Sequence, residues 1–525
     1  CQSGEYTRIA AACQTEADDD RTNTWIFELF GYLSFGVIIM QAYGARAAFR
    51  RMRLGTIGVL CTLCIVVALR SGALAYEIDL ENIAGVVYEL SLPRYAGRLT
   101  GTDGNWAAVE YVAERFRELG LVCADGLEGY LQPYAQPVRI MHSKPELEIV
   151  DAFGSVIKRF QSVNQFAPAV SPGCRVTGEV MSPGVIIRDI DDIREIRGEA
   201  VLLVPSHFTR DPTQIEAIMG CIMESCAEGR IQSPGVILET DTSDRGYFPI
   251  SSFVAPETDA SPQGSGGRGG TGGDHEQAAP EPMVLICDVP TFADISDATA
   301  EGAQVRMFMD YSVEQLQTAN VVGVLPGSAT DSPGDCLLIA AHIDHLGSNM
   351  DGTYNPGAMD NASGVAAMLE IARVLAESPE RPGKTVIFVA FNGEEQSTYG
   401  SRHYVSSPCF PLEQTSVVNI DTVGSPRGVL LQIENPAGHD TRLARDLCNN
   451  AEELGIPFRK SSSRGTDHSS FADVGVEAVN LIQPDFAGGY HGPGDTADKV
   501  DCQRIAEVVR LILAILEPAG TSCQY

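Results

Sequence analysis

Short apolar runs, each followed by polar residues, recur along the chain from residue 336 onward. Runs of this length, rich in β-branched and aromatic side chains, are typical of buried strands. They predict strands at residues 336–341, 385–391, 417–420 and 478–482. After the first run, residues 361–377 repeat apolar side chains at the spacing of one helix face. The alternation predicts an α/β fold, in which a mostly parallel central sheet is covered by helices on both faces.

Polar residues that could bind metal follow these predicted strands. They are, in chain order, His342, Asp360, Glu394, Glu395, Asp421 and His491. Because open α/β sheets place their sites at the carboxyl ends of strands, we expect these side chains to converge. Two imidazoles and several carboxylates suit zinc or a similar divalent ion, and one carboxylate can bridge two ions. Two ions about 3.5–4 Å apart could support a hydrolysis, which leaves one carboxylate as general base.

Each of these acids taken alone would be interpreted as a solvated loop carboxylate, so the prediction depends on the whole set in order. Two further histidines have less specific interpretations. His345 stands outside the pattern and is expected to be a hydrogen-bonding neighbour of the site or merely exposed. His468 is expected to be a hydrogen-bonding scaffold residue rather than a ligand.

Six short motifs carry a family resemblance. They are H-x-D at 342–344, GAMDNASGVA at 357–366, FNGEE at 391–395 with G-S following at 400–401, NIDTVG at 419–424, DHSSF at 467–471 and YHGPGDT at 490–496. In this order they resemble the di-zinc aminopeptidases of the bacterial leucyl aminopeptidase and glutamate carboxypeptidase group. The resemblance implies the zinc-peptidase fold and two zinc ions per chain.

The resemblance also implies a role for each metal-binding residue. His342 and Asp421 would bind one zinc ion, while Glu395 and His491 would bind the other. Asp360 would bridge the two ions. The ligand set of the family is therefore complete in this sequence.

Two further roles follow from the same resemblance. Glu394 would be the general base that takes a proton from water and hands it to the leaving amine. Asp344 would accept a hydrogen bond from His342 and fix its orientation, as carboxylates behind metal ligands commonly do. Tyr490 neighbours His491, but the resemblance assigns it no role.

The N-terminal part of the sequence resembles a targeting segment. Residues 52–75 begin with Met52-Arg53, continue with the apolar run 54–69 and end in an A-x-A site, which is the pattern of a secretory signal peptide. We therefore expect a secreted or periplasmic protein, with residues 1–51 as an upstream segment from an over-extended gene model. The alternative is an uncleaved N-terminal membrane anchor that uses both apolar stretches.

The remaining chain divides into three predicted parts. Residues 76–130 resemble the opening helices of the peptidase core, and residues 311–525 form its catalytic core. Between them, residues 131–310 contain short β-rich runs among Pro and Gly turns and resemble an inserted protease-associated domain, which would shape access to the site or bind substrate. Its low-complexity segment 257–282 is expected to be a flexible loop.

Composition excludes some classes of partner. The 525 residues carry 69 acidic and 37 basic side chains, a formal net charge of −32, and are 44% hydrophobic. This charge argues against nucleic acid and anionic membrane surfaces as partners, and the length and hydrophobic content support more than one domain. Of the fourteen cysteines, four precede the proposed cleavage site, and in an exported protein the remaining ten permit disulfides, for example between Cys221 and Cys226, although buried free thiols are equally compatible with the sequence.

These observations predict an exported di-zinc metalloaminopeptidase that hydrolyses the amino-terminal peptide bond of peptides. A carboxypeptidase or dipeptidase on the same core is the alternative, and it would require a cation such as Arg402, Arg427 or Arg464 for the terminal carboxylate. A non-catalytic receptor-like homologue would be expected to have lost ligands. A phosphatase-type di-metal hydrolase would fit the residue types but not the order of motifs. The sequence makes no prediction of oligomeric state.

Overall fold

The structure is a computed structural model. It describes residues 77–516 except 163, 170–174, 233, 241–252, 255–281, 329–335, 427, 439 and 484–488. Ile78–Leu516 form one compact unit. The predicted signal peptide, the segment before it and nearly all of the predicted loop 257–282 lie outside the described residues. Among the described residues, no helix is both long and apolar enough to cross a bilayer.

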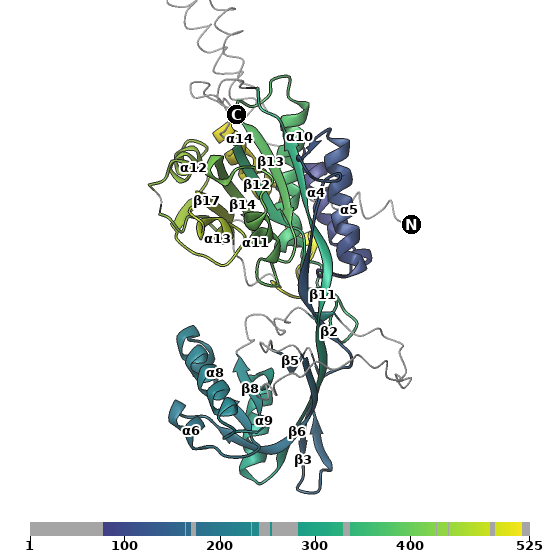
Figure 1. Cartoon of the computed structure of the whole chain (residues 1–525), viewed down its shortest axis with the longest axis vertical. Helices are drawn as coiled ribbons and strands as arrows, with labels where there is room; N and C mark the ends of the chain where they lie inside the picture. The colour runs from purple at the N-terminus through teal and green to yellow at the C-terminus, as the bar shows by residue number, and fades with distance from the viewer. Residues whose placement is uncertain are drawn as a thin grey trace, which may run out of the picture. The chain divides into compact units, whose positions relative to one another are not determined.

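The central sheet of the C-terminal part (Figure 1) is parallel in its middle, with an antiparallel strand pair on either side of the parallel strands. Strands β13 (Thr385–Phe391), β12 (Cys336–His342), β14 (Thr415–Asp421) and β17 (Ala478–Ile482) pair in parallel in that order. Beyond β17, β15 (Leu431–Glu434) is antiparallel and then pairs in parallel with β16 (Phe458–Ser461). The α/β prediction is thus confirmed, and the parallel strands are those whose ends carry the predicted site.

Helices cover both faces of this sheet. On one face, Tyr404 of α11 (Tyr399–Ser406) and Phe471 of α13 (His468–Ala472) belong to a buried cluster with Leu338 and Ala340 of β12. On the other face, α10 (Ser363–Glu377) contacts β12 and β14 and packs against α4 (Leu80–Leu90) and α14 (Cys502–Leu516). Because both faces are covered, β12 is buried along its whole length after Cys336, as expected for a parallel sheet between two helical layers. Two further helices complete this part, α5 (Asp103–Glu118) and α12 (Arg442–Glu453).

The segment between the opening helices and the catalytic part is rich in strands. Its parallel strands are β6 (Arg175–Ile186), β7 (Val201–Val204), β8 (Gly235–Thr240) and β10 (Met283–Asp288), paired in that order. Its other strands are β3 (Glu146–Val150), β4 (Val156–Arg159), β5 (Phe166–Pro168) and β9 (Phe253–Val254), and its helices are α6 (Ile190–Glu195), α7 (Ser206–Thr209), α8 (Pro212–Ala227) and α9 (Val289–Ala300). Whether this segment is a protease-associated domain stays a prediction.

One long strand runs through the predicted boundary at residue 310. β11 (Gln304–Leu325) pairs first with β3 and β6, then with β2 (Leu131–Met141), and finally with β13, while β1 (Val122–Cys123) pairs with its last residues. The middle of β11 is exposed, so it lacks the apolar signal that marks a strand, and its pairing with β2 maintains the extended backbone.

The suggested Cys221–Cys226 disulfide is absent, since both thiols are free and buried on α8. Residues five apart on an α-helix point in directions about 140° apart, which keeps these two sulfurs from meeting. Both side chains instead contribute to the apolar cluster beneath this helix.

Candidate metal centre

The structure brings the six predicted strand-end residues into one cavity. His342 and Asp421 end β12 and β14, and Glu394 and Glu395 follow β13. Asp360 lies in the turn before α10, and His491 lies in the loop after β17. All six line a cavity of about 610 Å³. Parallel strands produce this convergence because their carboxyl ends meet at the same edge of the sheet.

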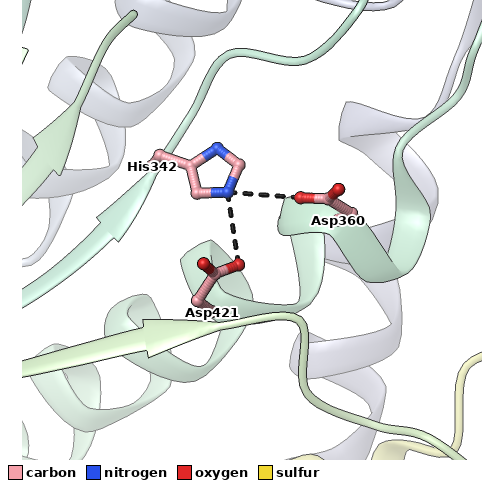
Figure 2. Close-up of side chains that lie close together, drawn as sticks. All are labelled: His342, Asp360 and Asp421. Atoms are coloured by element: carbon pink, nitrogen blue, oxygen red, sulfur yellow. Dashed lines mark hydrogen bonds and ion pairs between the residues drawn. The ribbon is translucent and has the colours of Figure 1, made fainter. Parts of the chain in front are cut away.

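One group of donors surrounds His342 (Figure 2). Its Nε2 atom lies 3.2 Å from Asp360 Oδ1 and 3.3 Å from Asp421 Oδ1. The three side chains are almost completely buried. Burial by itself lowers the pKa of His342, but the negative charge of Glu394 and the contacts with Asp360 and Asp421 outweigh it and raise the pKa well above its usual value.

A second group of donors lies on the other side of Asp360. His491 Nε2 is 3.0 Å from Asp360 Oδ2 and 3.4 Å from Glu395 Oε2. Asp360 therefore presents Oδ1 to one histidine and Oδ2 to the other. Its Oδ2 is buried, yet it receives no hydrogen bond of normal geometry from the described residues.

The spacing of the donors fits zinc. Zinc bonds of about 2.0–2.2 Å in tetrahedral geometry place neighbouring donor atoms about 3.3 Å apart. The four contacts of His342 and His491 span 3.0–3.4 Å, so each histidine and its carboxylates have the separations of ligands around a common ion. The donor set, imidazole nitrogens with carboxylate oxygens, is also one that zinc accepts.

Glu394 faces the same cavity without belonging to either donor group. Desolvation raises its pKa well above the usual value for a glutamate, and although His342 opposes this shift, Asp421 and Glu395 add to it. Its backbone amide donates to Asp344 Oδ1 at 3.1 Å, which ties the residue to the end of β12. A carboxylate beside the donor groups but outside them is suited to exchange protons.

The contacts of Asp344 differ from the expected ones. His342 Nδ1 makes its 3.2 Å contact with the backbone oxygen of Asp344, while the carboxylate Oδ1 is 3.8 Å away. The carboxylate instead accepts the backbone amides of Glu394, at 3.1 Å, and Glu395, at 3.2 Å. Asp344 therefore orients His342 through its main chain, and its side chain holds the two glutamates. Burial raises the pKa of Asp344 to about 6.

His345 is fully buried, so its interpretation as a merely exposed residue is wrong. Its Nδ1 atom lies 2.7 Å from Glu395 Oε1, inside the site. His468 is also buried, and its Nε2 lies 3.2 Å from the Ser463 carbonyl oxygen, as expected of a scaffold residue. The ring of Tyr490 stacks on His491 with centroids 3.8 Å apart.

Sequence reasoning missed two residues that support the metal centre. Asp495 accepts the backbone amides of Met359 at 2.8 Å and Asp360 at 3.0 Å, so it holds the turn that carries the shared carboxylate. Arg98 is completely buried, within the segment 76–130 that was interpreted only as the opening helices of the core. Asp495 lies within the family-like motif at 490–496, which was the available signal for it.

Arg98 connects the loops beneath the site. Its guanidinium donates to four backbone carbonyl oxygens: Ile343 at 2.9 Å, Leu90 at 2.6 Å, Pro356 at 2.6 Å and Gly357 at 2.8 Å. Ile343 directly follows His342, and Gly357 precedes Asp360 by three residues. One side chain therefore holds the loops that carry a residue of the first donor group and the shared carboxylate.

The fold and the donor groups together define a class: a metal centre of the hydrolase type at the strand ends of an α/β sheet. Comparison with known proteins finds a matching family. The model of peptidase family M28 matches residues 320–516 of this chain.

Curated relatives agree with this match. Aminopeptidase YwaD of Bacillus subtilis is 29% identical over 210 residues, which cover 38% of this chain and 44% of the relative. A probable zinc metalloprotease of Pyricularia oryzae is 28% identical over 253 residues, which cover 38% of this chain and 49% of the relative. The chain thus spans about half the length of the curated relatives that it matches.

Solved structures extend the likeness of the fold. The aminopeptidase from Aneurinibacillus sp. strain AM-1 aligns with a TM-score of 0.60 at 18% identity, covering 85% of this chain and 96% of that one. The zinc aminopeptidase BSAP from Bacillus subtilis aligns with a TM-score of 0.57 at 17% identity, covering 84% of this chain and 94% of that one. Both alignments cover more of the chain than the family match does, so the shared fold extends beyond residues 320–516.

Proposed function

We propose that this protein is an exported di-zinc aminopeptidase that hydrolyses the amino-terminal bond of peptides. The observation that carries the proposal is the position of Asp360, which turns one carboxylate oxygen toward His342 and the other toward His491. A carboxylate shared in this way by two donor groups suits a pair of ions. The family match and the names of the relatives supply the peptidase chemistry.

Five residues would hold the ions. His342 and Asp421 would bind one zinc ion, Glu395 and His491 would bind the other, and Asp360 would bridge them. When bound, such ions lower the pKa of water and polarise a carbonyl group.

The protein's own residues would then manage the proton. Glu394 lines the cavity beside both donor groups and would take a proton from the attacking water and deliver it to the leaving amine. The backbone bond from Glu394 to Asp344 keeps the base next to the end of β12.

A carboxypeptidase remains the second candidate because two cations line the same cavity, Arg459 and Arg464. Arg464 is already paired with Asp473, and Arg402 donates to Thr398 Oγ1 at 3.1 Å. Arg427, the third cation considered from sequence, lies outside the described residues. Arg459 is therefore the better of the described candidates for binding a terminal carboxylate.

Kinetics with two substrate panels distinguish these activities. The full chain, with zinc and after chelation, is given aminoacyl p-nitroanilides with a free amine and N-blocked dipeptides with a free carboxylate. Chelator-sensitive hydrolysis of the first panel supports the aminopeptidase, and hydrolysis of the second panel alone moves the assignment to carboxypeptidase. No hydrolysis of either panel by the zinc-bound protein would favour a non-catalytic binding protein.

Export is tested separately. The chain is expressed in a secreting host, and the N-terminus of the recovered protein is sequenced. Cleavage after residue 75, with mature protein in the medium or periplasm, supports the signal peptide. Recovery of the uncleaved chain in the membrane fraction would instead support the N-terminal anchor.

A further inference from the structure

His345 lies against the second donor group of the metal centre. Its ring is fully buried, and its centroid is 5.9 Å from that of His491, with the two rings edge to face. Its Nδ1 atom is 2.7 Å from Glu395 Oε1 and 3.9 Å from Asp360 Oδ2. His345, Asp360 and Glu395 therefore form a compact cluster that could in principle hold an ion by itself.

The distances distinguish a hydrogen bond from shared coordination. Two donors on one zinc ion lie about 3.3 Å apart, whereas a charge-assisted N–H···O bond spans about 2.7–2.9 Å. The contact between His345 and Glu395 has the length of the hydrogen bond. The contact between His491 and Glu395 is 3.4 Å and involves the other carboxylate oxygen, Oε2.

From this difference we infer that His345 is a positioning residue for the second zinc ion. It donates its Nδ1 proton to Glu395 Oε1 and so turns Oε2 toward Asp360 and His491. An ionised carboxylate only accepts hydrogen bonds, so Nδ1 is the nitrogen that carries the proton. The inference rests on the proposed di-zinc function and adds a residue outside its ligand set.

The surroundings of His345 hold the ring in this orientation. Its backbone amide donates to the Arg98 carbonyl oxygen at 3.3 Å. The ring also lies so close to Gly357 that a side chain there would come within 2.6 Å of its Cδ2 atom. Gly357 has φ +59°, a conformation that glycine adopts without strain. The Nε2 atom has no hydrogen-bond partner among the described residues, so the described contacts of the ring are made through Nδ1 and packing.

Zinc binding by full-length variants tests the inference without any substrate. Stoichiometry and the two dissociation constants are measured by competition with a chromophoric chelator, with zinc as the only added ligand. In His345→Ala we expect one of the two sites, the one proposed to contain Glu395 and His491, to lose about 10–100-fold in affinity, the usual effect of removing a partner behind a ligand. In His345→Asn the amide nitrogen occupies the place of Nδ1, so most of the affinity should return.

Two control variants distinguish a positioning role of His345 from direct binding of zinc and from the effect of an empty cavity. His491→Ala removes a proposed ligand and should abolish one site. His468→Ala removes an equally buried imidazole whose ring contacts a backbone carbonyl. It should leave both zinc affinities within about twofold of wild type. Its loss of stability shows what the cavity left by a buried imidazole costs by itself. Cobalt spectra add a further readout, because His345→Asn should keep the wild-type spectrum if no imidazole ligand is lost.

Each outcome decides the point. Unchanged affinities in His345→Ala would overturn the positioning role. A His345→Asn variant that loses one ion as completely as His491→Ala, with an altered cobalt spectrum, would make His345 a ligand and overturn it equally. Fewer than two zinc ions in the wild type would overturn the di-zinc proposal and this inference together.

Discussion

Arg98 should contribute more to stability than any surface arginine of this protein. The residue is fully buried, and its guanidinium donates to four backbone carbonyl oxygens, one at the end of α4 and three in two separate loops. The substitution Arg98→Met keeps much of the side-chain volume but removes all four donors and the charge. Arg98→Lys keeps the charge, but a single ammonium lacks the fork that reaches several carbonyls at once.

The magnitude follows from the unpaired carbonyls. A buried acceptor that loses its partner costs about 1–3 kcal/mol. Gly357 keeps a second bond, from the Ala362 amide, so three acceptors are affected most, and the sum is about 3–9 kcal/mol. Burying the charged guanidinium costs desolvation free energy in the wild type, and the variant avoids that cost, which offsets part of the loss. We therefore expect Arg98→Met to lower the free energy of unfolding by about 3–5 kcal/mol. The stability of Arg98→Lys should lie between that of Arg98→Met and that of the wild type.

Urea unfolding of the zinc-free proteins measures this loss, because zinc binding would otherwise mask part of it. Arg94→Met is the matched control, since Arg94 lies four residues away with 61% of its side chain exposed. The control should change stability by about 0.5 kcal/mol or less. An Arg98→Met variant as stable as this control would refute the role assigned to the buried guanidinium.

Three other predictions concern the site and its packing. Glu394→Gln should lower kcat by about 10²–10⁴ with unchanged zinc content, whereas equal losses of zinc and activity would contradict its role as base. Because the site carboxylates raise the pKa of His342 despite the opposing effect of burial, the zinc-free protein keeps this ring protonated to higher pH than a free histidine, and zinc must displace that proton. Zinc affinity should therefore rise with pH, and calorimetry in two buffers of different ionisation enthalpy should detect proton release; a pH-independent affinity would contradict this. Gly364→Ala should lower the free energy of unfolding by about 1–3 kcal/mol because its methyl group would overlap Asn361 Oδ1. Gly220 on α8 has open space around it, so Gly220→Ala should be neutral or stabilising. Thermal unfolding of both variants compares the two effects.

Local patterns of apolar and polar residues predicted the secondary structure well in segments that bury one or both of their faces. The predicted strand 385–391 matches β13, and the predicted strand 478–482 matches β17. The predicted boundary at residue 310 falls inside β11, whose exposed middle has no apolar periodicity. That part of the strand depends on pairing with β2, a contact between residues far apart in the sequence.

The contacts of individual atoms were beyond the reach of sequence reasoning. Asp344 was expected to bind His342 through its carboxylate, but the backbone oxygen takes that place. His345 was expected to be either a hydrogen-bonding neighbour of the site or merely exposed, and only the structure decided for the first, with Nδ1 2.7 Å from Glu395 Oε1. Arg98 donates to Ile343, which is 245 residues away in the chain. Such contacts follow from the relative positions of strand ends and loops, which no local periodicity records.

The sequence by itself determined which side chains are available at the strand ends, because apolar runs and the polar residues after them mark where each strand stops. The tertiary structure alone decided how those side chains are grouped. It turned the two oxygens of Asp360 toward different histidines and left Glu394 outside both groups. The physical reason is that grouping depends on distances of a few ångströms between separate strand ends, and these distances exist only once the sheet and its helices have packed.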